Sequence, residues 1–349
     1  MAYTAIDDPE AHFQAKLYTG NDSTQSITFD GSTDMQPDLI WIKSRTNGAS
    51  HVLTDAVRGV NSQLYSEGNW AAGTYTNMVT AFGSDGWTMG SNAQVNGAQN
   101  YVAWCWKAGT TSGIAGSPSI TPTSYSFNAT SGCSIIAYDG TGSNATLPHG
   151  LGVAPKAVFV KRLDTGGDWL VYHEKVEATE YLRLDNNQAE TTSSTAWNDT
   201  APTSTLFSIG DRNEVNNSSG TYVAYCFASK QGYSKFGSYE GNGNADGTFV
   251  YTGFRPAFVM TKYTSPGGGV GDWNMYDNKR KGYNDENDYL AANTTSAENS
   301  SDNQVDLLSN GFKWRATDSD TNEDGSTYVY MAFAESPFVN SEGVPTNAR

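Results

Sequence analysis

Hydrophobic side chains dominate a six-residue stretch that recurs three times along the chain, at 101–106, 222–227 and 328–333. Read with the two-residue period of a strand, the second, fourth and sixth positions place valine and then bulky side chains on one face. The other positions place tyrosine and then mostly small residues on the opposite face. Because a strand that is apolar on both faces is buried on both, the pattern predicts three central strands.

The same order of elements precedes each copy of this stretch. A proline leads an apolar strand that ends in lysine, then a second strand, a leucine, an Asn-containing turn and a turn-rich approach follow. Proline fixes the entry to a strand where no ladder hydrogen bond is required of it. Short strands separated by turn signals are typical of a β-sandwich or jelly roll. The expected fold is therefore all-β, with three tandem homologous β-sandwich (jelly-roll-like) repeats.

The segments between the repeats set the expected boundaries. The first junction is rich in Ser, Thr and Gly and contains Pro118 and Pro122, which is typical of a linker. The second junction is short, so the last two repeats are expected to pack together, with the first attached more freely. The expected organisation is an N-terminal docking arm at 1–13, repeat 1 at 14–107, a linker at 108–131, repeat 2 at 132–229, repeat 3 at 230–335 and a C-terminal arm at 336–349.

Composition and charge narrow the classes of function. Charged residues make up 17% of the chain, below the roughly 25% of ordinary soluble domains, and 36 glycines accompany many Ser, Thr and Asn residues, as in all-β surface proteins. The net charge of −16 argues against nucleic acid and anionic membrane as partners, because a phosphate backbone needs clustered Lys and Arg. No apolar run suggests a signal peptide or a spanning helix, so synthesis in a cytoplasm is expected. Cys105 and Cys226 occupy matching positions and are expected to be buried thiols.

The candidate metal site is an acidic turn before the third copy of the central strand. Asp318, Asp320, Asn322 and Asp324 supply side-chain oxygens at alternate positions and precede a glycine, as at the start of a calcium loop. A full EF-hand is excluded, because its twelfth position counted from Asp320 is Met331 and not glutamate. A looser calcium site stays open beside the plainer interpretation as a solvated hairpin, and no other cofactor is expected.

Two tryptophans are the candidate ligand contacts. Trp70 and Trp197 lie in polar loops, where an aromatic face can stack on a sugar, although both can instead cap a sandwich. Lys43, Lys161 and Lys262 each end an apolar strand and are expected to extend to water instead of binding a ligand. The four histidines lack metal-ligand spacing, and no nucleophile elbow is present, so a non-enzymatic role is expected.

Several longer strings carry a resemblance to a known family. They are Gly150–Pro155, Trp197–Ser204, Tyr222–Ala228, Gly232–Tyr239, Gly253–Pro256 and Tyr330–Glu335. From Phe13 onward, the chain resembles a tandem-repeat family of virion structural proteins in tailed phages, especially those of marine bacteria and cyanobacteria. The resemblance implies a structural protein or domain of unknown function, sometimes attached to lectin-like sandwich domains in longer fibre proteins. It brings no catalytic residues with it.

The resemblance and the composition lead to two main functional hypotheses. The first is a non-enzymatic, surface-exposed virion appendage, a fibre, knob or adhesin that contacts a glycan or protein of the host cell. The second is a capsid or tail decoration protein that binds only other virion subunits, and a glycan-cleaving tailspike ranks third. Phage appendages are commonly homotrimers, so the resemblance implies a trimer, unless the three repeats imitate one within a single chain. The expected location is the virion, after synthesis in the bacterial cytoplasm.

Overall fold

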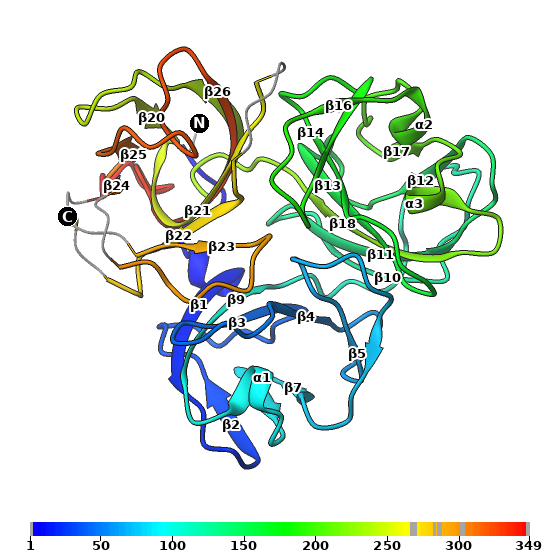
Figure 1. The fold of residues 1–349 in the computed structure, drawn as a ribbon, viewed down its shortest axis with the longest axis horizontal. Coiled ribbons are helices and arrows are strands. Elements are labelled where there is room, and N and C mark those ends of the chain that lie inside the picture. The colour runs from blue at the N-terminus through cyan, green and yellow to red at the C-terminus, as the bar shows by residue number, and fades with distance from the viewer. Residues whose placement is uncertain (1–2, 266–270, 282–283, 285–287, 301–303, 347–349) are drawn as a thin grey trace.

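The computed structural model describes residues 3–265, 271–281, 284, 288–300 and 304–346. Nearly all regular structure consists of strands, and the strand pairs of the described residues are antiparallel. The strands form three lobes around a common centre, here called lobe 1 (residues 13–106), lobe 2 (124–227) and lobe 3 (234–337) (Figure 1). The prediction of an all-β protein is confirmed.

Lobe 1 combines a larger sheet of order β1-β9-β3-β4 with a smaller sheet of order β2-β8-β7. A short ribbon, β5 (Ser62–Gln63) and β6 (Gly73–Thr74), extends from it, and η1 (Pro9–Ala11) precedes it. The remaining elements are β1 (Phe13–Thr19), β2 (Gln25–Thr28), β3 (Leu39–Ser44), β4 (Val52–Asp55), β7 (Val79–Gly83), β8 (Gly86–Met89), α1 (Ala93–Asn96) and β9 (Asn100–Trp106).

Lobe 2 repeats this plan with a larger sheet of order β10-β11-β18-β13-β14-β15-β16 and a smaller pair, β12-β17. Its elements are β10 (Ser124–Asn128), β11 (Cys133–Asp139), β12 (Ala145–Pro148), β13 (Ala157–Arg162), β14 (Leu170–His173), β15 (Glu180–Arg183), β16 (Thr191–Thr192), α2 (Ser194–Trp197), β17 (Leu206–Ile209), α3 (Asn213–Asn216) and β18 (Thr221–Phe227).

Lobe 3 has a larger sheet of order β19-β26-β21-β22-β23 and a smaller sheet of order β20-β25-β24. Its elements are β19 (Ser234–Glu240), β20 (Phe249–Tyr251), β21 (Phe254–Tyr263), β22 (Asn274–Asp277), β23 (Leu290–Ala291), β24 (Val305–Leu308), β25 (Gly311–Trp314) and β26 (Thr327–Pro337). In the described part of the chain, no helix has the length and apolar character needed to cross a bilayer.

The connecting segments differ from the sequence-based expectation in three places. Residues 108–131, predicted to be a linker, include β10, which pairs with β11 at the edge of the lobe 2 sheet. Two one-turn helices, α1 and α3, lie in the turn-rich segments before β9 and β18, where the sequence predicted only turns. Pro256 lies inside β21 and not before it, at a shift in register that accommodates its missing N–H group.

The three predicted central strands are β9, β18 and β26, and each has a paired strand on both sides. Their alternate residues face two different cores. In β9, Val102, Trp104 and Trp106 point to a core shared by all lobes, whereas Tyr101 and Cys105 point to the core of lobe 1. The prediction that these strands are buried on both faces is confirmed, as is the prediction of buried thiols.

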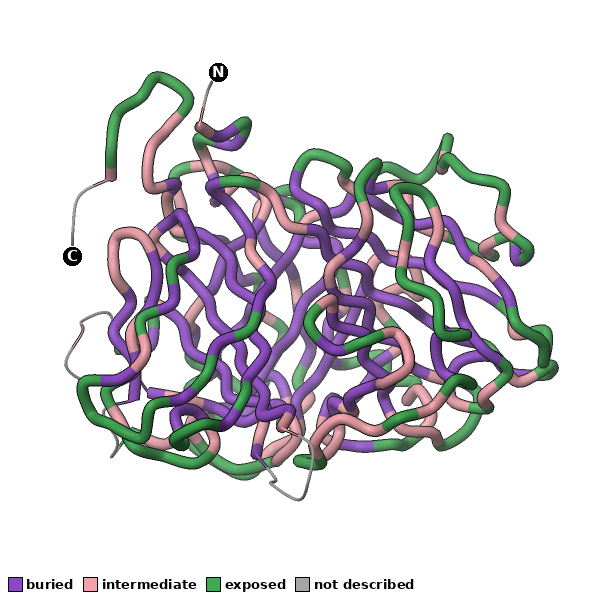
Figure 2. Tube along the Cα trace, turned by 90° about the horizontal axis from the view of Figure 1, so that it is seen from above, coloured by how far each residue is buried: buried purple, intermediate pink, exposed green. Residues whose placement is uncertain are grey.

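The shared core joins the three lobes into one unit, and Figure 2 shows buried segments running through the middle of the molecule. The Trp106 ring of lobe 1 lies 5.9 Å from Phe227 of lobe 2 and 5.6 Å from Phe333 of lobe 3. Phe13 of lobe 1 stacks on Phe333 at 5.4 Å. The expectation that the first repeat is attached more freely is therefore wrong, because its largest side chains pack directly on the other two lobes.

Each lobe carries the same pair of stacked tyrosines, with ring centroids 5.1 Å apart. The pairs are Tyr18 with Tyr101, Tyr138 with Tyr222, and Tyr239 with Tyr328. In every pair, both hydroxyl groups donate to backbone carbonyls of the turn before the final strand, and the second hydroxyl also accepts a backbone N–H. The tyrosines therefore fix this turn against the strand in the same way three times.

A buried asparagine completes each of these turns. Asn96, Asn216 and Asn322 hold the same place, and each side-chain amide donates to carbonyl oxygens of two separate loops. Each amide oxygen accepts the backbone N–H of a residue just after β1, β11 or β19, respectively. Because a buried amide is costly unless it is hydrogen-bonded, these contacts specify the loop positions closely.

Contacts between lobes run in one direction around the centre. The residues just before β4, β14 and β22 each contact a backbone carbonyl of a neighbouring lobe: His51 with Ala291, Trp169 with Tyr65, and Trp273 with Arg183. Lobe 1 thus contacts lobe 3, lobe 2 contacts lobe 1, and lobe 3 contacts lobe 2. These contacts close a ring.

His51 takes part in this ring as a neutral side chain. The Trp41 indole donates to His51 Nδ1 at 2.9 Å, so the ring proton lies on Nε2, which donates to the Ala291 carbonyl at 3.0 Å. Burial, followed by the nearby charge of Lys43, holds the pKa of His51 well below its usual value. The imidazole therefore acts at neutral pH as a hydrogen-bonding group and not as an acid or base.

Candidate functional site

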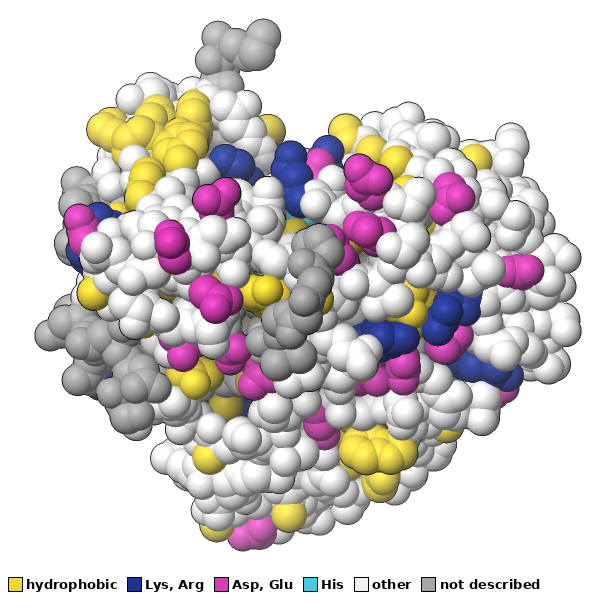
Figure 3. Space-filling model, turned by 45° about the horizontal axis from the view of Figure 1, so that its top comes forward, with side chains coloured by type: hydrophobic (Ala, Val, Ile, Leu, Met, Phe, Trp, Pro, Cys, Tyr) yellow, Lys and Arg dark blue, Asp and Glu magenta, His cyan; other side chains and the backbone are white. Residues whose placement is uncertain are grey.

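An open groove lies where lobe 3 faces lobe 2, and its volume is about 830 Å³. One wall comes from Glu174 and Lys175, just after β14 of lobe 2. The floor and the other wall come from residues 229–239, which include β19, and from residues 249–253 around β20. Figure 3 shows basic side chains gathered in the hollow between these lobes, with hydrophobic side chains beside them on lobe 3.

The charge of the groove is positive. Lys175, Lys230 and Lys235 line it, and its acidic residue, Glu174, is ion-paired at 2.7 Å with Lys156. Burial lowers the pKa of Lys230, and burial with the neighbouring charge of Lys175 lowers the pKa of Lys235. Partly dehydrated ammonium groups beside one another favour an anion as their neighbour.

Aromatic rings form the wall of the groove on lobe 3. In β20, Val250 is buried while Phe249 and Tyr251 are 45% and 46% exposed, because successive side chains of a strand point to opposite faces. Tyr3 joins them: its hydroxyl lies 3.1 Å from the Tyr251 hydroxyl and donates to the Gly253 carbonyl at 2.9 Å. Large exposed rings beside polar groups are typical of ligand contacts.

The two predicted tryptophan platforms have different positions. Trp197 is only 2% exposed, and it packs edge to face on Tyr172 inside lobe 2, so its prediction as a glycan platform is wrong. The short helix α2 turns this side chain inward, and the alternative interpretation, a cap on the sandwich, describes it. Trp70 is 56% exposed and lies edge to face with Tyr65 at 5.9 Å, so it stays a candidate ligand contact outside the groove.

The predicted calcium loop does not gather its four side chains. Asn322 is buried, and its amide is saturated by loop contacts, so it is not free to bind a metal. The Asp318 carboxylate accepts a hydrogen bond from the backbone N–H of Asp320, and Asp324 takes no part in this hydrogen bond. Within the described ranges, no group of three or more His, Cys, Asp or Glu side chains is placed to hold a metal ion. Asn322 is therefore corrected from a candidate ligand to a structural residue.

The three repeated lysines do not reach water, contrary to the prediction. Lys43, Lys161 and Lys262 are buried, and their ammonium groups donate to backbone carbonyls of the loop after their own strand. Lys43 also donates to the Thr295 carbonyl of lobe 3 at 3.2 Å. Burial lowers their pKa values to about 8, about 8 and about 7, respectively. These side chains fasten loops at the lobe boundaries, which a strand pattern does not reveal.

We expect the stability contribution of Lys262 to depend on pH. In the unfolded chain a lysine pKa is about 10.4, whereas burial, partly offset by Asp272 and Asp320, lowers it to about 7 in the folded protein. Between these values the unfolded state binds more protons, so raising the pH stabilises the folded state. The free energy of unfolding of the wild type, relative to that of Lys262→Met, should rise by up to about 1.4 kcal/mol per pH unit between pH 7 and 10. Denaturant unfolding at several pH values measures this gain.

The matched control for that measurement is Lys279→Met, because the Lys279 side chain is more than one-third exposed. The difference in the free energy of unfolding between Lys279→Met and the wild type should change little over the same pH range. A constant difference between Lys262→Met and the wild type would contradict a buried, weakly basic Lys262.

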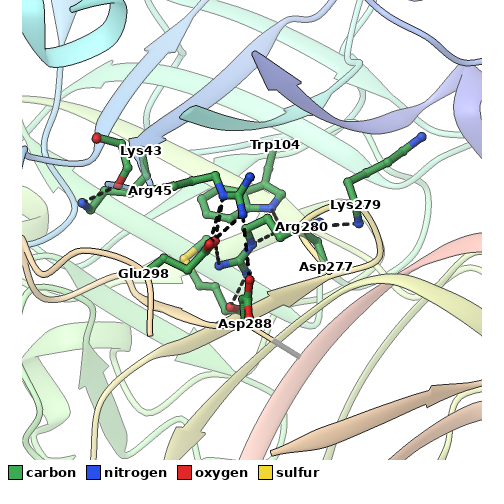
Figure 4. A network of polar contacts seen from close by, with 10 residues as sticks. Lys43, Arg45, Trp104, Asp277, Lys279, Arg280, Asp288 and Glu298 are labelled. Atoms are coloured by element: carbon green, nitrogen blue, oxygen red, sulfur yellow. Dashed lines mark hydrogen bonds and ion pairs between the residues drawn. The ribbon is translucent and has the colours of Figure 1, made fainter. Parts of the chain in front are cut away.

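A polar network joins lobes 1 and 3 away from the groove (Figure 4). Arg45 of lobe 1 pairs with Glu298 of lobe 3 at 2.7 Å, and Arg280 bridges Glu298 and Asp277. The Trp104 indole donates to Asp277 at 3.0 Å and also lies beneath the Arg280 guanidinium. These charges pair with one another, so the network acts as a structural joint between the two lobes.

Sequence reasoning missed the groove because three separate segments form it. Two local signals were present. One is the alternation of side chains at Phe249, Val250 and Tyr251, and the other is the pair Lys230 and Lys235, at the short junction between the last two repeats. Neither signal indicates that Glu174 and Lys175, just after β14, lie across the groove from lobe 3. The proximity of these segments depends on how lobes 2 and 3 pack.

The fold and the groove together define an all-β protein in which sandwich-like antiparallel sheets surround a shared core and carry an open, basic and aromatic surface groove. The chain belongs to the DUF7483 family, described as a domain of unknown function, whose model matches residues 8–337. No curated protein and no solved structure matches it.

Proposed function

We propose that this protein is a non-enzymatic structural protein of a phage virion, exposed on the particle surface, which contacts a host-cell glycan through the groove between lobes 2 and 3. The observation that carries this proposal is the groove itself, which combines exposed rings with three lysines that form no salt bridge within the described part of the chain. The resemblance to virion proteins of tailed phages supports the location.

We also propose that the three lobes are tandem copies of one β-sandwich unit. The stacked tyrosines and the buried asparagines, with the same hydrogen bonds in each lobe, support a common origin. The closed ring of lobe contacts favours a single chain that imitates a trimer over the homotrimer that the resemblance implies. A mass of 37.6 kDa by sedimentation would support the single chain.

A binding role is favoured over glycan cleavage by the composition of the groove. Glycosidases use two carboxyl groups on either side of the scissile bond. Among the described residues that line the groove, Glu174 is the acidic side chain, and Lys156 pairs with it. This arrangement supplies positive charge for binding and lacks the second carboxylate.

The alternative function, a decoration protein that binds other virion subunits, is favoured by the terminal segments. Both segments lie on lobe 3: the Tyr3 hydroxyl and the Phe338 N–H donate to the Gly253 carbonyl. The Ser341 N–H also donates to Asp7 at 2.7 Å. Together they form a projecting surface at one end of the molecule, which suits attachment to a particle (Figure 2).

A reconstruction of a particle that carries this chain tests the proposal. We expect the groove to face outward, clear of neighbouring subunits. A position within a closed head lattice, with the groove covered by neighbouring subunits, would support the decoration role and overturn the adhesin role.

A further inference from the structure

We propose that the groove binds an acidic glycan, a chain whose sugar rings carry carboxylates, as uronic acids do. The inference rests on the proposed function and names the ligand class of that same site. Lys175, Lys230 and Lys235 would contact the carboxylates, and Phe249 and Tyr251 would contact the flat faces of the sugar rings.

The charge of the groove contrasts with that of the chain. The protein has 37 acidic residues and only 21 Lys and Arg, yet three lysines line this one groove. Most basic side chains elsewhere pair with carboxylates, as Arg58 does with Asp55 and Arg162 with Asp164. Among the described residues, neither Lys175 nor Lys230 forms a salt bridge. Glu174, which lies in the same wall as Lys175, pairs with Lys156. Among the residues that the structure describes, the groove therefore holds more positive than negative charge.

The Lys235 ammonium shows how the groove orients its charges. It donates to the Tyr251 carbonyl at 2.6 Å and lies 5.2 Å from the centre of the Tyr251 ring. These contacts hold the ammonium beside an exposed aromatic face. A sugar ring that stacks on Tyr251 therefore places its carboxylate within reach of an ammonium that is already positioned, which reduces the entropic cost of binding.

The size and the polar groups of the groove also suit a carbohydrate. Its volume of about 830 Å³ lies within the range of small-ligand pockets, roughly 300–1,000 Å³. Ser229, Gln231 and Ser238 also line it, and these side chains can hydrogen-bond to sugar hydroxyl groups.

A single-stranded nucleic acid would also combine negative charge with stacking, but the molecule as a whole disfavours it. A nucleic acid carries one charge per nucleotide and is bound through extended basic tracks, whereas this chain has a net charge of −16. A uronate-containing glycan of the same length carries a similar charge, but every sugar presents hydroxyl groups, which the polar side chains of the groove can bind.

Calorimetric titration of the full chain tests the inference with three probes of similar length: a hexamer of galacturonic acid, a neutral hexamer of glucose and a six-nucleotide DNA strand. We expect the galacturonate hexamer to bind and the other two to bind at least about tenfold more weakly. Raising the salt concentration should weaken the binding, because the contacts are ionic and partly exposed.

Variants connect this binding to the groove. The double variant Lys175→Gln with Lys230→Gln should lose at least about tenfold in affinity for the acidic hexamer, because two charge-assisted contacts disappear. Phe249→Ala should also weaken binding. Lys279→Gln, which removes one positive charge outside the groove, should bind like the wild type. Equal unfolding midpoints for the lysine variants and the wild type confirm that the fold is unchanged.

The outcomes separate this inference from the function on which it rests. If the neutral hexamer binds as well as the acidic one and Phe249→Ala weakens both, the groove binds glycans and the acidic class is wrong. Preferential binding of DNA, or binding of the acidic hexamer that the groove variants do not change, overturns the inference. If no glycan binds at millimolar concentration, the assignment of a glycan to this groove is wrong, while the particle position still tests the virion role.

Discussion

Replacing Trp106 by alanine is expected to lower the free energy of unfolding by about 3–5 kcal/mol, the usual range for removal of a large buried aromatic ring. Trp106 is only 1% exposed and lies at the centre of the shared core. Its ring contacts Phe13, Phe227, Phe258 and Phe333 at centroid distances between 5.1 and 5.9 Å. Denaturant unfolding followed by tryptophan fluorescence and circular dichroism measures the loss.

The control for Trp106→Ala is Trp70→Ala, because Trp70 is exposed and lies outside the shared core. Surface substitutions of this kind usually change stability by about 0.5 kcal/mol or less. Because Trp106 contacts side chains of the other two lobes, its loss should shift one common transition. A separate early transition that involves lobe 1 alone would contradict the shared core.

Asp277→Asn is expected to cost about 3 kcal/mol, because it removes one of the two carboxylates that compensate the buried charge of Arg280. Asp277 accepts the guanidinium of Arg280 at 2.7 Å and the indole N–H of Trp104 at 3.0 Å, and neither member of the ion pair is exposed. Burial alone would raise the pKa of Asp277, but the charge and hydrogen bonds of Arg280 lower it. The carboxylate therefore stays ionised, and the joint between lobes 1 and 3 depends on it.

Asp164→Asn provides the comparison for Asp277→Asn. The Asp164 carboxylate pairs with Arg162 at 2.9 Å, but it is exposed enough for solvent to screen the pair. We expect a loss of about 1 kcal/mol or less from this variant. Equal losses of stability from the two variants would contradict a larger contribution from the joint between lobes 1 and 3.

The alternation of side chains predicted much of the fold. In β9, β18 and β26, bulky residues on one face and tyrosine with small residues on the other indicated burial on both sides, since each face needs a packing partner. The pattern did not indicate that the three bulky faces meet in one core. That arrangement arises from contacts between residues far apart in the chain, such as Phe13 and Phe333, which no local period encodes.

The polar residues were harder to place from sequence. A lysine at the end of an apolar strand usually extends to water, but Lys262 instead finds the Gly271 carbonyl inside a loop. Trp197 stands in a polar stretch, yet the one-turn helix α2 ends in a left-handed residue, Asn198, and directs the ring inward. In both cases a few loop dihedral angles decide the burial of a side chain, and the sequence pattern does not specify those angles.

The packing of three similar lobes on a shared core implies the claim that they unfold as one cooperative structure. Native-state hydrogen exchange of the amides in β9, β18 and β26 tests it most directly, because it reports the free energy of opening for each lobe separately. We expect the slowest amides of the three strands to exchange with the same free energy, equal to that of global unfolding. If β9 opens at a clearly lower free energy than β18 and β26, lobe 1 is an independent unit and the claim is wrong.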